Sequence, residues 1–189
     1  MELVKIITIA VSSSVLAAIL TSVFNLIIQN RNYKRDYYKK IIEKRIDAQE
    51  QIIKLSTELK IMVHLDNGKL CNSVFTNGES HFDEFIILLA STVNQSFWLS
   101  EQLGEILLNL NISLLEEIRY KIQSKNKVER DNEIELLGIK NLEKFRGYRK
   151  QLERQILIDF ADMDKVRSFI NSKRKSKNKL YELRKDVNS

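Results

Sequence analysis

Proline is absent from the chain, and glycine occurs only five times in 189 residues. Proline breaks helices because it lacks an N–H and its ring clashes with the preceding turn, and glycine weakens them through its conformational freedom. A chain poor in both is expected to form long helices with few interruptions. The same scarcity excludes a proline-rich spacer and a glycine-rich flexible linker.

Cysteine and histidine are also scarce. The single cysteine, Cys71, excludes an intrachain disulfide and fits a reducing compartment. His64 and His81 stand seven and ten residues from it, whereas zinc sites usually show closer pairs. The glycines are too scattered for a phosphate-binding loop, and no G-x-S-x-G motif is present. We therefore expect neither a metal nor a cofactor, no catalytic residues, and a protein that is not an enzyme.

One long apolar run is present. Residues 6–28, IITIAVSSSVLAAILTSVFNLII, contain no charged side chain. A helix of about 23 residues is roughly 34 Å long, enough for the ~30 Å hydrocarbon core of a bilayer. The sequence therefore predicts a transmembrane anchor within residues 1–30. A cleaved signal peptide is the alternative, although such a peptide has about 7–15 apolar residues and carries its positive charge before them.

Basic residues gather after the run rather than before it. Between residues 31 and 45, seven Lys and Arg stand against two acidic residues. Because positive residues stay on the cytoplasmic side, we expect the N-terminus outside the inner (plasma) membrane and the bulk of the chain in the cytoplasm. Tyrosines favour the headgroup level. The predicted membrane-interface residues are Arg31, Tyr33, Lys34, Arg35, Tyr37 and Tyr38.

Small residues recur every four positions inside the run. They let two helix backbones approach closely in lipid, and a buried amide favours a partner on another helix. The predicted association face is Ala10, Ser14, Ala18, Ser22 and Asn25. We expect a homo-oligomer on this basis. The alternative is that these side chains bond to their own backbone.

The rest of the chain predicts an all-α fold, in which the transmembrane helix continues into a cytoplasmic antiparallel helical bundle. The residues of one apolar row follow one another at steps of four, three, four and three, the spacing of a packed helix seam: Ala48, Ile52, Leu55, Leu59 and Met62. A second row, Ile42, Ile46 and Ile53, widens this seam into the stripe of a helix inside a bundle. The expected parts are an anchor (1–30), a juxtamembrane basic segment and stalk helix (31–65), a turn-rich loop (66–80), a helical domain (81–172) and a basic tail (173–189).

Turn and capping signals predict where the later helices begin. Asp66-Asn67-Gly68 and Asn77-Gly78 predict turns, with a short strand or a loop at 70–76 between them. Helices are expected over about 81–109 and 114–124, and from 132 for about 38 residues, antiparallel to the first helix. Their expected capping pairs are Ser80/Asp83, Ser113/Glu116 and Asn132/Glu135. Asp159, Asp162 and Asp164 are expected on a solvated face of the last helix.

The C-terminal tail is strongly basic. Lys173, Arg174, Lys175, Lys177 and Lys179 are the predicted contacts to an anionic lipid surface or ligand. If the last helix runs antiparallel to the stalk, lipid headgroups are the nearest anions. Nucleic acid or a nucleotide is a less favoured ligand, and a tail that only aids solubility is the remaining alternative.

The general plan resembles small bacterial membrane proteins with one N-terminal span and a helical cytoplasmic domain, some of which serve in phage defence or toxin modules. The resemblance covers no specific motif. We expect a non-enzymatic single-span protein whose helical domain oligomerises and binds a partner or signal. Its expected partners are membrane lipids, further copies of the chain and another protein. The alternative is a membrane-disrupting effector, a pore or leak, gated by a ligand such as an anionic nucleotide.

Overall fold

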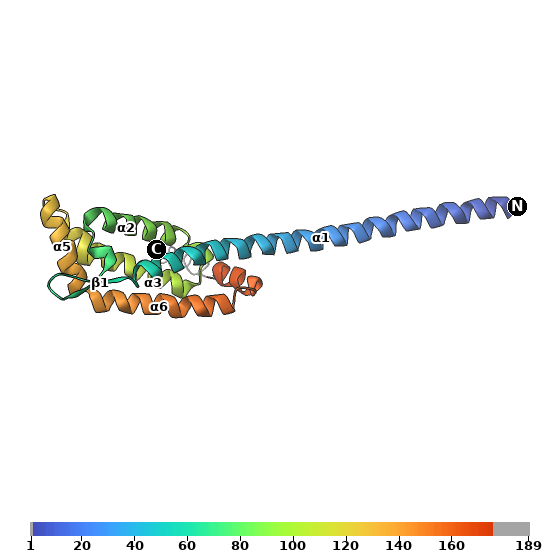
Figure 1. Cartoon of the computed structure of the whole chain (residues 1–189). Helices are drawn as coiled ribbons and strands as arrows, with labels where there is room; N and C mark the ends of the chain where they lie inside the picture. The colour runs from blue at the N-terminus through green and yellow to red at the C-terminus, as the bar shows by residue number, and fades with distance from the viewer. Residues whose placement is uncertain (1, 176–189) are drawn as a thin grey trace, which may run out of the picture. The chain divides into compact units, whose positions relative to one another are not determined.

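The computed structural model describes residues 2–175, with side chains from Thr21 onward (Figure 1). The described chain is mostly helical, with one small hairpin and short turns, which confirms the predicted all-α class. It divides into two units, residues 1–41 and 42–189. None of the helices in the described part combines the length and the apolar character that a membrane crossing requires. Most of the predicted span, residues 6–28, lies outside the residues whose side chains are described.

Helix α1 (Glu2–Glu58) begins in the first unit and ends in the second. It ends earlier than the expected Leu65, because a bond from the N–H of Lys60 to the carbonyl of Thr57 tightens its last turn. The predicted seam is confirmed from Ala48 to Leu59, where all of its residues are buried. Its last residue, Met62, was predicted wrongly, because it lies in a strand beyond the helix. The wider stripe was wrong, since Ile46 and Ile53 are exposed.

A hairpin follows α1, in the region predicted as a turn-rich loop. Strands β1 (Met62–His64) and β2 (Leu70–Asn72) are antiparallel, with Val63 opposite Cys71. Gly68 has a φ of 74°, a conformation that glycine adopts without strain in this turn. A 3₁₀ turn, η1 (Ser73–Phe75), comes next, so the segment 70–76 is a strand followed by a turn.

The predicted helix over 81–109 is two helices, α2 (Gly78–Asn94) and α3 (Glu101–Leu114). The 3₁₀ turn η2 (Ser96–Trp98) separates them, and Ser100 caps α3 because its Oγ accepts a hydrogen bond from the N–H of Leu103 at 3.2 Å. Helix α3 continues into a π-helical turn, η3 (Leu115–Arg119), and then α4 (Tyr120–Ile122). Ser113 therefore lies buried within a continuous helical stretch, and the expected cap there was wrong.

The last predicted helix is also divided, into α5 (Lys127–Lys140) and α6 (Leu142–Ala161). Helix α5 begins at a capping box formed by Asn126 and Glu129, six residues before the expected pair. The break falls at Asn141, whose side-chain amide donates to the carbonyl of Leu137 at 2.9 Å. A turn follows at 162–164, and residues 166–175 are helical again.

Within the second unit, α3 packs against both α2 and α6, and α5 packs against α2 (Figure 1). The second part of α1 runs antiparallel to α6, as predicted: Arg45 bonds to residues 162 and 163, and Gln49 bonds to Asp159. The aromatic core centres on Phe75, whose ring lies 5.9 Å from that of Phe82 and 5.1 Å from that of Phe145. This packing places the start of α3, the end of α6 and Arg45 of α1 around one hollow.

Candidate functional site

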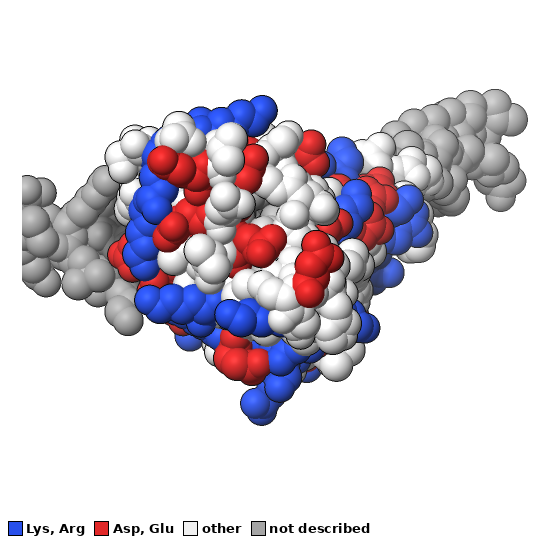
Figure 2. Space-filling view, turned by 60° about the vertical axis from the view of Figure 1, so that its left-hand side comes forward, with Lys and Arg blue, Asp and Glu red and all other residues white. Residues whose placement is uncertain are grey.

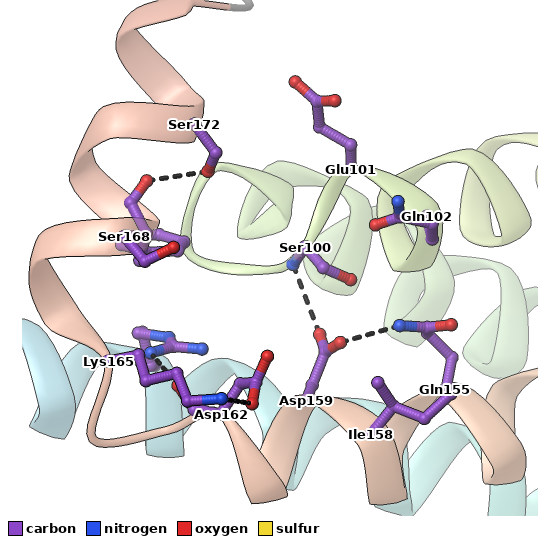
Figure 3. A pocket seen from close by; sticks show the side chains of 12 residues that line it. Ser100, Glu101, Gln102, Gln155, Ile158, Asp159, Asp162, Lys165, Ser168 and Ser172 are labelled. Carbon is purple, nitrogen blue, oxygen red and sulfur yellow. Dashed lines mark hydrogen bonds and ion pairs between the residues drawn. The ribbon is translucent and has the colours of Figure 1, made fainter.

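The hollow is a pocket of about 440 Å³ in the second unit, hereafter the interhelix pocket (Figure 3). Four segments form it: α1, the start of α3, the end of α6 and the segment that follows α6. Its lining residues are Arg45 from α1; Ser100, Glu101 and Gln102; Gln155, Ile158, Asp159 and Asp162; and Lys165, Ser168, Phe169 and Ser172.

Arg45 joins α1 to the segment that follows α6. Its Nη1 donates to the carbonyl oxygens of Met163 at 2.9 Å and Asp162 at 3.3 Å. Its guanidinium carbon lies 4.6 Å from the centre of the Phe169 ring, a cation–π distance. Only 5% of Arg45 is exposed, and this burial lowers the pKa of its guanidinium while three nearby aspartates oppose the shift. Arg45 is therefore a buried residue that links α1 to the segment after α6, and it is not a free cation.

Asp159 is the corresponding buried charged residue on α6. It is 4% exposed, and its carboxylate accepts hydrogen bonds from the amides of Gln155 at 2.8 Å and Gln49 at 3.3 Å. The backbone N–H of Ser100, at the N-terminus of α3, donates to it at 3.3 Å (Figure 3). Three donors compensate the buried charge, and they tie α1, α3 and α6 together. The expectation that Asp159 lies on a solvated face was wrong.

Lys173 holds the segment after α6 from its other end. Its ammonium lies 5.7 Å from the Phe169 ring centre and 5.8 Å from that of Phe97, and donates to the carbonyl of Ser96 at 3.5 Å. Burial lowers the pKa of the Lys173 ammonium, Glu101 and Asp159 oppose this shift, and Arg45 adds a smaller lowering by repulsion. Phe169 therefore has contacts with two cations, one from α1 and one from its own helical segment.

The pocket also presents polar groups without a hydrogen bond inside the fold, although one of them, Glu101, attracts the ammonium of Lys173. Within the described residues, the carboxylate of Glu101, the amide of Gln102 and the hydroxyl of Ser168 form no hydrogen bond. The Lys165 ammonium instead pairs with Asp162 at 2.6 Å. These groups are suited to binding. No lining residue is a His or Cys, and no hydroxyl among them contacts a general base.

A second, smaller hollow of about 250 Å³ lies at the end of η3 and α4. Two arginines line it, and both are already paired: Arg119 with Asp83, and Arg130 with Glu79 at 3.2 Å. Figure 2 shows Lys and Arg interspersed with Asp and Glu on the face of the molecule that this view turns toward the reader. That face therefore lacks the continuous positively charged surface that nucleic-acid binding needs.

The predicted membrane and association residues lie in the first unit where they are described. Ser22 and Asn25 are exposed on α1, as are Arg31, Tyr33, Lys34, Arg35 and Tyr37. Tyr38 is half-buried, and its ring lies 6.1 Å from that of Tyr37. The side chains of Ala10, Ser14 and Ala18 lie outside the described residues. The structure does not test these assignments, which remain predictions.

The predicted tail contacts separate into different environments. Lys173 folds onto Phe97 and Phe169, whereas Arg174 and Lys175 are exposed. Lys177 and Lys179 lie outside the described residues. The candidate metal-ligating residues do not form a cluster: Cys71 is fully buried, with its Sγ 4.0 Å from the carbonyl of Glu135, and His81 pairs with Glu84 at 3.7 Å. Across the described chain, no three metal-ligating side chains come together.

The sequence reasoning assigned none of the pocket residues to a binding site, and Arg45 and Asp159 are the two whose spacing carried a signal. Arg45 was assigned to the basic segment, although its position three residues before the seam residue Ala48 indicated the buried face of α1. Asp159 follows Leu152 and Ile156 at steps of four and three, again the buried register. A charged residue in an apolar register was therefore the available signal. Comparisons of the chain with known protein families, with curated proteins and with solved structures find no match, so function is argued from these residues alone.

Proposed function

We propose that this chain is a non-enzymatic, single-span membrane protein whose helical domain faces the cytoplasm, forms oligomers and binds a partner or signal. One observation carries the proposal. Five apolar side chains near the start of the described side chains are exposed in the structure: Val23, Phe24, Leu26, Ile27 and Ile28.

These five residues cover most of the surface of their part of α1. Successive helical residues point about 100° apart, so the five spread widely around the helix and leave Asn25 and Ser22 on the remaining side. Their exposed fractions range from 43% for Ile28 to 67% for Phe24. Exposed apolar surface of this extent is typical of membrane or protein contact. The charge-free sequence from residue 6 continues it to the length of a bilayer span.

The orientation follows from the basic residues after the apolar stretch. Arg31, Lys34 and Arg35 begin the positive segment, and positive residues remain in the cytoplasm. Tyr33 is 72% exposed and Tyr37 47%, which suits side chains at the level of the lipid headgroups. The second unit would then lie on the cytoplasmic side.

The interhelix pocket supports the signal-binding part of the proposal. Arg45 belongs to both the pocket wall and α1, the helix that continues from the apolar stretch. A molecule bound in the pocket would contact the segment that Arg45 fastens to α1, and would therefore favour one arrangement of that segment over another. Oligomerisation through Ser22, Asn25 and the small residues before them would bring several such domains together.

Two measurements on the full chain test the proposal. After alkaline carbonate washing, the full chain should stay in the membrane fraction, whereas a variant that begins at Asn32 should be released. A reporter active only outside the cytoplasm, fused after Ser189, should remain inactive. Release of the full chain by carbonate would exclude the span, and an active reporter would exclude the orientation.

A further inference from the structure

We propose that the interhelix pocket binds an uncharged, hydroxyl-rich molecule of about one or two sugar rings. The proposal deepens the proposed function, because it names the class of signal that the helical domain takes. It also distinguishes this pocket from a site for an anionic nucleotide.

Both cations that line the pocket and two of its three carboxylates already have partners within the protein. Three carboxylates line it against two cations. Asp162 pairs with Lys165 at 2.6 Å, and Asp159 accepts three hydrogen bonds. Arg45 is engaged by two carbonyls and the ring of Phe169. An anionic ligand would have to break one of these pairs and approach Glu101, so the pocket disfavours it.

The polar groups that remain are those that recognise hydroxyls. Glu101 offers acceptors, and Gln102 offers both a donor and an acceptor. Ser168 and Ser100 each keep a hydroxyl proton to donate, since Ser100 Oγ only accepts from Leu103. Gln155 uses its amide N–H toward Asp159, which leaves its carbonyl oxygen to accept. A hydroxyl donates and accepts at once, so a molecule with several hydroxyls can satisfy this mixed set.

Size and shape agree with this class. About 440 Å³ is within the range of roughly 300–1,000 Å³ that small-molecule pockets occupy. Ile158, 48% exposed at the wall, gives an apolar surface for the C–H face of a ring. Phe169 already has Arg45 and Lys173 on its ring, which makes it a poor platform for stacking a nucleobase.

The test is a binding titration of the purified full chain in a detergent without a sugar headgroup, because a maltoside would compete. The uncharged probes are glucose, N-acetylglucosamine and trehalose, and the charged probes are AMP, inorganic phosphate and spermidine. We expect saturable binding of an uncharged probe with a Kd of about 10 μM to 1 mM by calorimetry, and no binding of the charged probes in that range.

Two variants locate the binding. Gln102→Leu and Ser168→Ala remove polar groups that form no hydrogen bond in the described structure, so the fold should be kept. Each should weaken the uncharged probe about tenfold or more. The matched controls Gln151→Leu and Ser91→Ala change exposed residues outside the pocket and should leave the Kd unchanged. Far-UV circular dichroism should show the same helix content in all four.

Three results would overturn the proposal: no uncharged probe saturates, a charged probe binds instead with sensitivity to Gln102→Leu, or the control variants weaken binding as much as the pocket variants. These results are independent of the carbonate wash. A chain that binds trehalose but leaves the membrane would contradict the proposed function alone, and a chain that stays in the membrane without binding any uncharged probe would contradict this inference alone.

Discussion

Helix α1 carries apolar side chains in both of the units it crosses, and the two sets differ in their surroundings. In the first unit, Phe24 and Leu26 are 67% and 65% exposed. In the second unit, Ile52 and Leu55 are fully buried by the helical domain. Removing a Leu or Ile side chain from water is worth about 1.5–3 kcal/mol, so the first set can still gain that stabilisation from lipid or from another chain. The comparison shows that the apolar seam of α1 is covered in the second unit and that residues 23–28 are not covered in the first.

The largest expected effect tests how firmly the second part of α1 is held. Asp159→Ala should lower the free energy of unfolding by about 3–5 kcal/mol, because it removes the aspartate that most offsets the burial of Arg45 and leaves three donors without an acceptor. Urea unfolding followed by circular dichroism would measure it. The matched variant Asp162→Asn changes a half-exposed carboxylate paired with Lys165, and should cost less than about 1 kcal/mol. Similar losses of unfolding free energy for both variants would show that the buried contacts of Asp159 with α1 and α3 do not stabilise the domain.

A leucine pair compares the two parts of α1 directly. Leu55→Ala should destabilise the second unit by about 2–5 kcal/mol, because it removes buried methyl groups and leaves a cavity. Leu26→Ala should leave the unfolding transition of the helical domain unchanged, since Leu26 contributes to no core there. Thermal unfolding of the full chain in detergent would show both. A loss for Leu26→Ala as large as that for Leu55→Ala would contradict the division of α1 into exposed and buried parts.

How much of the structure could be predicted from the sequence depends on how far apart in the chain the interacting residues lie. The seam from Ala48 to Leu59 was predicted correctly because periodicity reports burial of a face directly. Helix boundaries were less accurate. At the break over residues 95–100, the N–H of Ser100 donates to Asp159, a contact between residues 59 positions apart that no local pattern reports. The π-helical turn at Leu115–Arg119 likewise follows from packing, and its sequence carries no turn signal.

The pocket could be predicted only in part. The register of Asp159 already placed it beside Ile156 on the buried face, so a buried carboxylate was readable from spacing. Its donors Gln49 and Ser100 come from two other helices, and nothing local identifies them. The segment after α6 was expected to be part of a long helix, and its docking through Phe169 depends on the turn at 162–164.

Two glycines of the second unit provide a smaller test of core packing. At Gly138 an added Cβ would lie 2.5 Å from the Cβ of Phe75, so Gly138→Ala should cost about 1–3 kcal/mol through overpacking. At Gly147, inside α6, nothing lies within 4 Å of such a Cβ. Gly147→Ala should therefore stabilise the helix by about 0.5–1 kcal/mol. Urea midpoints would measure both, and a common sign for the two changes would contradict this account of the core.

The smallest expected effect concerns Cys71 in the hairpin. Burial raises the pKa of its thiol from 9.0 to about 11. As the pH rises, this thiol ionises in the unfolded chain before it ionises in the folded chain. The stabilisation that the neutral buried thiol contributes to the fold is therefore complete below about pH 9 and is lost as the pH rises through about 11. The difference in unfolding free energy between the natural chain and Cys71→Ala should therefore shrink over this interval. Parallel pH profiles of the two proteins would show that Cys71 is not buried as described.

The most direct test of the central claim, that residues 23–28 lie in lipid while the helical domain lies in water, compares two positions of α1. Ile27 and Ile53 are similarly exposed in the structure, at 49% and 42%. Each is replaced by Cys in a Cys71→Ala background. The membranes are then treated with a water-soluble maleimide that is given access to both of their faces. Lipid should shield Ile27→Cys until detergent is added, because a thiol in hydrocarbon does not ionise, whereas Ile53→Cys should react at once. Equal labelling of both positions in intact lipid would contradict the account.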